Sequence, residues 1–288
     1  MAEPPARPRR TWPALDLDAR RAATPPADAG DRLAVAFDDA GAVAVESDGT
    51  SHWRVFFDSA EARAHATPGV LAALGSWLDV SAIDVEDEGW AVKVQQELGP
   101  ITAGRFIVAP PWHVPAVGAD QIVVVIEPSA GFGTGHHQST RLCLRAIERL
   151  PVAGWRVMDV GTGSGVLAIA CAMAGAGAVL AIDHDADAVD AARANLTRNG
   201  VAHCVTARVI DVGTCRAEPA DLVMANLTVH LLRRLARAIA ALVRPGGLLV
   251  TSGFTTDQAA LVADAFPDFL VVARDDEDDW TGLTLRRT

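Results

Sequence analysis

The stretch Trp155–Gly200 reads WRVMDVGTGSGVLAIACAMAGAGAVLAIDHDADAVDAARANLTRNG and decides the fold. It begins with the apolar run 157–160, breaks at the glycine-rich turn 161–165, and continues as a helix of small residues. A second apolar run, 178–182, then ends on an aspartate. A strand, a tight turn, a helix, a strand and an acid in this order are typical of the first half of a nucleotide-binding sheet.

The same alternation of strands and helices continues to the end of the chain. The predicted strands are 205–210, 221–225, 248–252, 269–273 and 282–286, with helices at 230–243 and 257–266, and before Trp155 the chain has a further strand at 121–126 and a helix at 141–150. This pattern predicts an α/β fold with a doubly wound, mostly parallel seven-stranded sheet. The last two strands form a hairpin, so we expect one antiparallel edge strand. Their acidic turn, Asp275–Asp279, is expected to be a solvated turn, with a docking site for a basic substrate as the alternative.

The region before residue 121 divides into three parts. Residues 1–30 are rich in proline and arginine, and we expect a mobile segment there, with one short strand at 11–18. Residues 31–88 predict a small α+β domain, residues 89–120 a connector, and residues 121–288 the main domain. Within the small domain we expect one helix at 31–40 and a second that ends at Leu78, and strands at 42–46, 52–57 and 82–86. Together with the strand 11–18, these elements would form a β-α-β-β-α-β arrangement.

Composition limits the function classes. The 288 residues are 50% hydrophobic, which is enough for a large core, and the net charge of −11 argues against DNA or RNA binding through phosphate contacts. A basic protein partner is compatible with this charge. No signal peptide or membrane span is evident, so we expect a cytoplasmic protein. The four cysteines lack CxxC spacing, which favours reduced, buried thiols.

Four candidate ligand-binding positions follow the predicted parallel strands. They are the turn Gly161–Gly165, Asp183, Asp211 and Asn226, and in a doubly wound sheet the ligand lies outside these carboxyl ends. Glycines at Gly161 and Gly163 allow the backbone to approach a ligand closely. Asp183 lies 22 residues beyond Gly161, where a carboxylate commonly meets the two hydroxyls of a ribose.

The spacing of the glycines narrows the choice of cofactor. A dinucleotide site needs GxGxxG, but Val166 occupies the third glycine position and the turn reads GxGxG. This favours S-adenosylmethionine, which has a ribose and an adenine but no phosphates. A nicotinamide oxidoreductase and a turn with only a structural role remain the alternatives.

The segment Glu127–Thr140, together with VMDVGTGSGVLAIA, AIDHDADAVDAARANLTRNG and DLVMANL, resembles the ribosomal protein L11 methyltransferase (PrmA-like) family from about Trp90 to the end. The resemblance implies a class I methyltransferase that uses S-adenosylmethionine, with Thr140, Gly161, Asp183 and Asn226 contacting the cofactor. It also implies that the N-terminal region holds a ribosomal-protein substrate. The family's THPTT is replaced here by HHQST at 136–140, and its ANIL by ANLT at 225–228.

The expected reaction moves a methyl group to an amine nitrogen, of lysine side chains or of the N-terminus. The candidates for shaping the acceptor pocket are Phe132, Thr134, Asn226 and Thr228. Two of them, Phe132 and Thr134, are also candidates for contacting the cofactor. We expect replacement of Asn226 to affect turnover and cofactor affinity most. No metal is expected, because the adjacent pair His136-His137 lacks a third ligand nearby in the sequence. The alternatives for the function are another protein's lysines, a small molecule, or a non-catalytic module that binds the cofactor.

Overall fold

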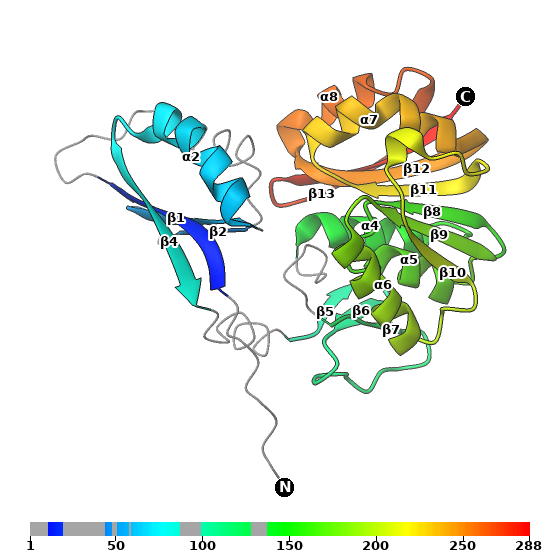
Figure 1. Cartoon of the computed structure of the whole chain (residues 1–288). Helices are drawn as coiled ribbons and strands as arrows, with labels where there is room; N and C mark the ends of the chain where they lie inside the picture. Colours follow the sequence, from blue (N-terminus) through cyan, green and yellow to red (C-terminus); the bar gives the residue numbers. More distant parts are fainter. Residues whose placement is uncertain (1–10, 20–43, 48–50, 58, 87–98, 128–136) are drawn as a thin grey trace, which may run out of the picture. The chain divides into compact units, whose positions relative to one another are not determined.

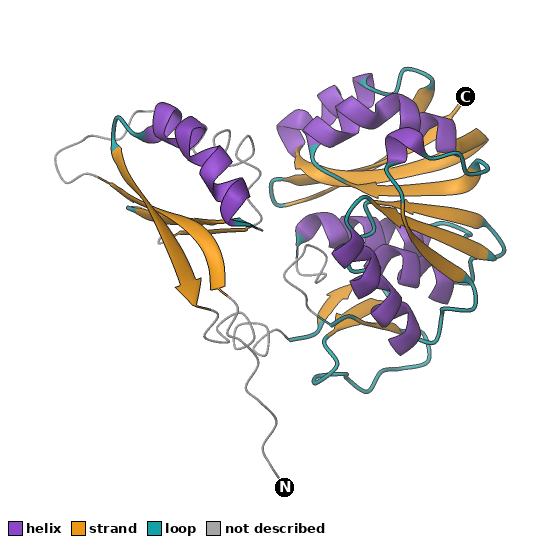
Figure 2. Cartoon of the chain, in the orientation of Figure 1, coloured by secondary structure: helices purple, strands orange, loops and turns teal. Residues whose placement is uncertain are grey.

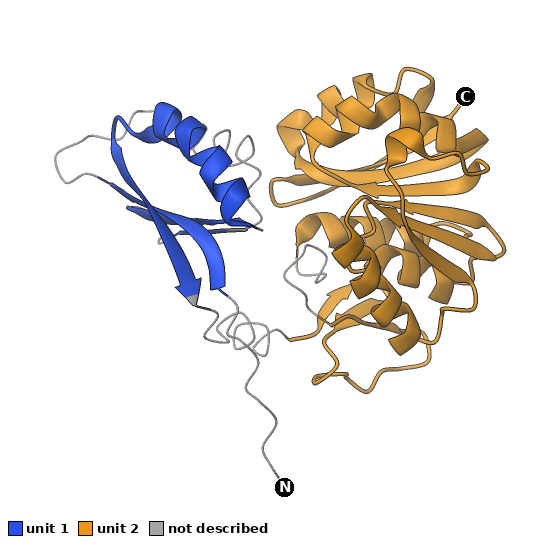
Figure 3. Ribbon diagram, viewed as in Figure 1, with its two compact units in different colours: residues 1–94 blue, residues 95–288 orange. Residues whose placement is uncertain are grey.

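The computed structural model describes residues 11–19, 44–47, 51–57, 59–86, 99–127 and 137–288. The chain forms two compact units, residues 1–94 and 95–288 (Figure 3). The predicted connector 89–120 is divided between them, since its strands from residue 101 onward belong to the second unit. No helix among the described residues is long and apolar enough to cross a membrane.

The first unit is an antiparallel sheet covered on one face by a helix (Figures 1 and 2). Its elements are β1 (Thr11–Ala19), β2 (Ala44–Ser47), β3 (His52–Phe56), α2 (Ala60–Leu74) and β4 (Leu78–Glu86), and the strand order is β2-β3-β1-β4. Leu15 and Leu17 of β1 are fully buried in the core beneath α2. Because β1 is an inner strand, the separation of residues 1–30 from the small domain is wrong at this strand. The predicted helix 31–40 lies outside the described residues.

The second unit confirms the predicted doubly wound, seven-stranded sheet (Figure 1). The strand order is β10-β9-β8-β11-β12-β14-β13. The strands are β8 (Arg156–Val160), β9 (Ala178–Asp183), β10 (Val205–Val209), β11 (Ala220–Asn226), β12 (Val243–Thr255), β13 (Phe269–Glu277) and β14 (Trp280–Arg287). The inner strands are nearly continuous apolar runs because both faces of the sheet are covered.

Helices cover the two faces of this sheet, and a separate core lies beneath each layer (Figure 2). One layer holds α4 (Gln138–Arg149), α5 (Val166–Met173) and α6 (Ala186–Arg198), and the other holds α7 (Val229–Leu242), α8 (Ala259–Asp264) and the short turns η1 (Val212–Thr214) and η2 (Thr256–Gln258). Alternate residues of β8 face opposite layers, with Val157 in the first core and Met158 in the second.

The expected place of the antiparallel strand is wrong. β14 runs antiparallel to both β12 and β13 and lies between them, so the edge strand β13 has the direction of the parallel strands. After α8 the chain first forms β13 at the edge of the sheet and then returns as β14 between β13 and β12. A three-stranded sheet of β5 (Ile101–Ala103), β6 (Phe106–Ala109) and β7 (Ile122–Val125) packs against the layer of α4 and α5, and β7 lies within the predicted strand 121–126.

Candidate functional site

The turn after β8 has a backbone that requires glycine at three positions. Gly161, Gly163 and Gly165 have φ values of 71°, 52° and 85°, in the left-handed region that side chains disfavour. A Cβ at Gly161 would lie 2.5 Å from Cδ2 of Leu227, at the end of β11. The Leu227 side chain therefore packs directly on the backbone of Gly161, where any larger residue would displace it.

Asp183 closes the turn from the side of β9. Its Oδ2 accepts a hydrogen bond from the backbone N–H of Gly163 at 3.0 Å, and its Oδ1 accepts one from the N–H of Asp185 at 3.2 Å. The side chain of Asp183 is only 10% exposed, whereas that of the adjacent His184 is 85% exposed. The structure thus brings together Gly163 and Asp183, two of the residues that the sequence proposed for the cofactor site.

Thr140 and Asn226 meet although they are 86 positions apart in the sequence. The Asn226 side-chain amide donates to Oγ1 of Thr140 at 3.3 Å, which links the first turn of α4 to the carboxyl end of β11. Thr140 is buried, while Asn226 is half-buried. Asn226 therefore keeps polar surface at the same edge of the sheet as the glycine turn.

Three other predicted residues have different outcomes. Asp211 is exposed, and its side chain caps the turn η1 by accepting from the N–H of Gly213 at 2.7 Å, so the structure gives it a local structural role. Its contact with the cofactor stays a prediction. Phe132 and Thr134 lie outside the described residues. Cys143, Cys171, Cys204 and Cys215 are all free thiols, and all but Cys204 are buried, as expected.

Asp159 is a site residue that the sequence reading missed. It is fully enclosed beneath the turn, where its Oδ2 accepts from the hydroxyl of Thr162 at 2.7 Å and from the N–H of Ala168 at 3.1 Å. Burial, with a smaller contribution from the negative charge of Asp183, raises the pKa of Asp159 to about 6. The signal for this residue was an acid inside the apolar strand VMDV, directly before the glycine turn.

Asn195, on α6, is a second missed residue and supports the site from behind. Its Nδ2 donates to the carbonyl of Ser164 in the turn at 2.9 Å, and its Oδ1 accepts from the N–H of Glu127 at 3.0 Å. One turn later, Asn199 pairs with both backbone groups of Val125 at 2.7 and 2.8 Å. These two amides, one buried and one half-buried, fix the end of β7 relative to the glycine turn.

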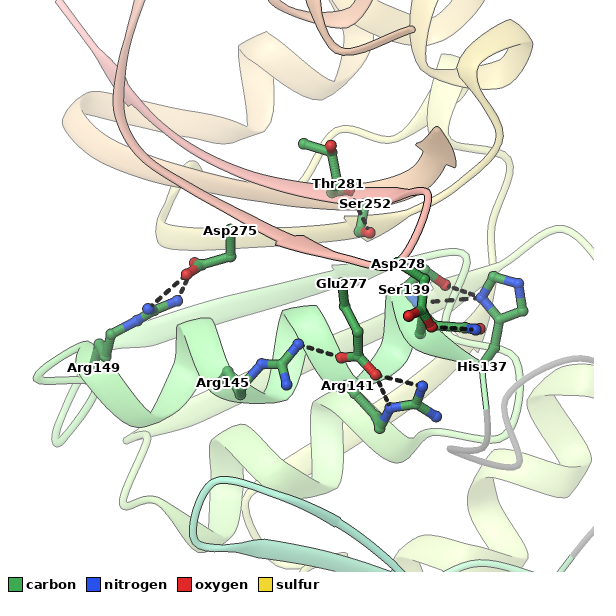
Figure 4. Close-up of polar contacts among 11 residues, drawn as sticks. His137, Ser139, Arg141, Arg145, Arg149, Ser252, Asp275, Glu277, Asp278 and Thr281 are labelled. Atoms are coloured by element: carbon green, nitrogen blue, oxygen red, sulfur yellow. Dashed lines mark hydrogen bonds and ion pairs between the residues drawn. The ribbon is translucent and has the colours of Figure 1, made fainter. Parts of the chain in front are cut away.

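The acidic run Asp275–Asp279 is neither a freely solvated turn nor an open docking site. Three of its side chains contact polar side chains of α4 (Figure 4). The pairs are Asp275 with Arg149, Glu277 with Arg141 and Arg145, and Asp278 with Gln138. The spacing of the three arginines places them on one helix face, and this face is held by the hairpin of β13 and β14.

The arrangement suits a nucleoside without phosphates. Asp183 carries carboxylate oxygens at the end of β9, where they suit the hydroxyls of a ribose, and the left-handed φ values of the turn allow the close backbone approach that such a ligand uses.

Comparison with known proteins identifies a family. Residues 37–288 match the sequence model of the family described as Ribosomal protein L11 methyltransferase (PrmA), so the match begins well before Trp90. Ribosomal protein L11 methyltransferases from Deinococcus radiodurans and Symbiobacterium thermophilum are 36% and 37% identical, over 86% and 69% of this chain and 92% and 66% of their own lengths. The crystal structure of a ribosomal protein L11 methylase from Lactobacillus delbrueckii subsp. bulgaricus has 29% identity and a TM-score of 0.62, covering 66% of this chain and 100% of that one.

Proposed function

The chain belongs to the ribosomal protein L11 methyltransferase family, and on that premise we propose that it transfers methyl groups from S-adenosylmethionine to amine nitrogens of a ribosomal protein. The acceptors are lysine side chains or the N-terminal amine. The observation that carries the proposal is the convergence of Gly163, Asp183, Thr140 and Asn226 at the carboxyl edge of the parallel sheet. The resemblance to the family implies that the cofactor binds at this edge.

The chain's own residues fit S-adenosylmethionine in three ways. Asp183 would accept hydrogen bonds from the ribose hydroxyls, the backbone at Gly161 would lie along the ligand, and Thr140 and Asn226 would hold the end that carries the reactive group. When bound, this cofactor supplies a methyl group on a positively charged sulfur. Asp159 holds the turn in place by accepting from Thr162 and Ala168.

The protein's remaining task is to present a neutral amine in line with that methyl group. A lysine amine has a pKa of about 10.4 in water, and a desolvating pocket lowers it. Orientation in a bound pair supplies on the order of 7–11 kcal/mol of the barrier without a strong protein base. Asn226 is the side chain that we place closest to this step, because its amide is half-buried at the strand end and already oriented by Thr140.

The first unit suits the recognition of a basic protein. On the sheet face opposite α2, four carboxylates lie near one another across the strands, from Asp16, Asp18, Glu46 and Asp79. Among the described residues, the cationic side chains His52 and Arg54 on this face contact Asp16, and Arg54 also lies 3.9 Å from Glu46. Ribosomal proteins are generally basic, so we assign substrate recognition to this unit.

Two experiments test the proposal. Calorimetry with S-adenosylhomocysteine and with NAD decides the cofactor, and binding of NAD alone contradicts the proposal. Incubation with a labelled methyl donor and either a lysate rich in ribosomal proteins or one depleted of ribosomes decides the acceptor. We expect a labelled ribosomal protein in the first lysate only. Asn226→Ala should lose turnover or cofactor affinity, and wild-type values for both would remove Asn226 from the site.

A further inference from the structure

The C-terminal hairpin ends in a pair of residues that both contact the beginning of α4. Glu277 and Trp280 are opposite each other in the ladder of β13 and β14, and we call this pair the terminal rung. Oε1 of Glu277 accepts from Nε of Arg141 at 2.7 Å, and its Oε2 contacts Arg145 (Figure 4). Burial alone would raise the pKa of Glu277, but the hydrogen bonds and charges of the two arginines outweigh it and lower this pKa.

Trp280, the other member of the rung, packs against the residue that caps α4. Its ring lies edge-on to His137, with centroids 4.2 Å apart and an interplanar angle of 80°. His137 is the N-cap of α4, because its Nδ1 accepts from the N–H of Ser139 at 3.2 Å. Burial, together with the positive charge of Arg141, lowers the pKa of His137, so that the ring stays neutral and able to accept.

The rung is itself fixed to the sheet at the level of Asn226. Ser252 on β12 is the register partner of Asn226, and its hydroxyl donates to the carbonyl of Thr281 at 2.7 Å (Figure 4). Thr281 follows Trp280 directly, and both Ser252 and Thr281 are fully buried. The contacts therefore form a closed circuit from Asn226 through β12 and the rung to α4, and back to Asn226 through Thr140.

A glycine permits α4 to lie this close to the hairpin. A Cβ added at Gly282 of β14 would lie 3.1 Å from Cβ of Leu142, a tighter contact than most side chains make. Within α4, Thr140 faces the core and Arg141 faces the hairpin. Any displacement of the helix relative to the rung therefore moves Thr140 relative to Asn226.

From this circuit we propose that Glu277 and Trp280 are positioning residues of the cofactor site, acting through α4 to set the place of Thr140 against Asn226. The inference rests on the proposed function, in which Thr140 contacts the cofactor. In the part of the chain that the structure describes, Glu277 and Trp280 contact α4 through Arg141, Arg145 and His137. Their effect is on the affinity for the cofactor, because the first turn of α4 is held before the ligand arrives.

The same hairpin offers a matched control. Asp275 pairs with Arg149 through the same chemistry, eight residues further along α4, which is about 12 Å from Arg141 along the helix axis. This second pair is more exposed, with Arg149 at 51% against 19% for Arg141. Glu277→Gln and Asp275→Asn each remove one carboxylate charge from one hairpin, but only the first change lies at the end of the helix that carries Thr140.

Calorimetric titration of the full chain with S-adenosylhomocysteine tests the proposal. We expect Glu277→Gln to raise Kd by roughly three- to tenfold, and Asp275→Asn to leave it within about twofold of wild type. Glu277→Asp, which keeps the charge, should recover part of the affinity. In a Thr140→Ala background the effect of Glu277→Gln should shrink, since residues that act through one another are not additive. Equal Kd values for Glu277→Gln and Asp275→Asn overturn the proposal.

Hydrogen exchange without ligand separates failure of this inference from failure of the proposed function. We expect faster exchange at the amides of residues 139–141 in Glu277→Gln, and no change there in Asp275→Asn. If wild type bound no S-adenosylhomocysteine but this difference appeared, the proposed function would fail and the positioning of α4 would stand. Unchanged exchange in Glu277→Gln overturns the inference whatever the wild type binds.

Discussion

Replacing Asp159 by asparagine should remove a pH dependence that the buried carboxyl imposes on folding. In the folded chain burial raises the pKa of Asp159 to about 6, compared with 3.8 for a free aspartate. Between these values the folded state holds a proton that the unfolded state has released, so stability falls as pH rises. The difference of about two pKa units corresponds to about 3 kcal/mol. The cost is complete about one pH unit above 6, where the carboxyl is ionised in the folded state as well.

Urea unfolding of wild type and Asp159→Asn between pH 4.5 and 7.5 measures the effect. The free energy of unfolding of the variant minus that of wild type should increase with pH, by about 2 kcal/mol over this window and mostly below pH 6. Other titrating groups cancel in this difference, because they are common to both proteins. A difference that stays constant with pH would refute the burial and the hydrogen bonds that we assign to Asp159.

Two further changes test the geometry of the site. Gly161→Ala should cost about 1–2 kcal/mol of stability because its φ is positive, and it should also weaken binding of S-adenosylhomocysteine because the new Cβ displaces Leu227. Gly154 serves as the control, since its φ is 76° and the space around it is open. Gly154→Ala should therefore lower the free energy of unfolding in urea by a similar amount but leave binding unchanged. His137→Asn keeps a capping side chain that does not titrate. Since the pKa of His137 is lowered, thermal unfolding should show wild type losing stability relative to this variant as pH falls from about 7 to 5, and parallel curves would contradict the neutral cap.

The sequence predicted the main sheet well because both of its faces are covered. Runs such as 178–182 and 222–225 are apolar throughout, and each ends where the chain leaves the core. The order of the last three strands was not predictable in this way. Periodicity reports which residues are buried, but it does not report whether β14 lies at the edge or between β12 and β13.

The site was predicted only where its residues follow strands or match a motif. Asp183 and Asn226 could be found at strand ends, but Asp159 lies inside a strand, where an acid in an apolar run gives no indication of its partners. The acidic run 275–279 was misread for a related reason. Charge patterning describes one segment at a time, whereas the partners of Glu277 lie more than 130 positions earlier, on α4.

The most direct test of the central claim is mass spectrometry of purified ribosomal protein L11 after incubation with this chain and S-adenosylmethionine. We predict mass increases in whole multiples of one methylene unit, mapped by fragmentation to lysine side chains or to the N-terminal amine, and absent when Asp183→Ala replaces wild type. An unmodified substrate after incubation with wild-type chain that binds S-adenosylhomocysteine would contradict the assignment of a ribosomal-protein acceptor.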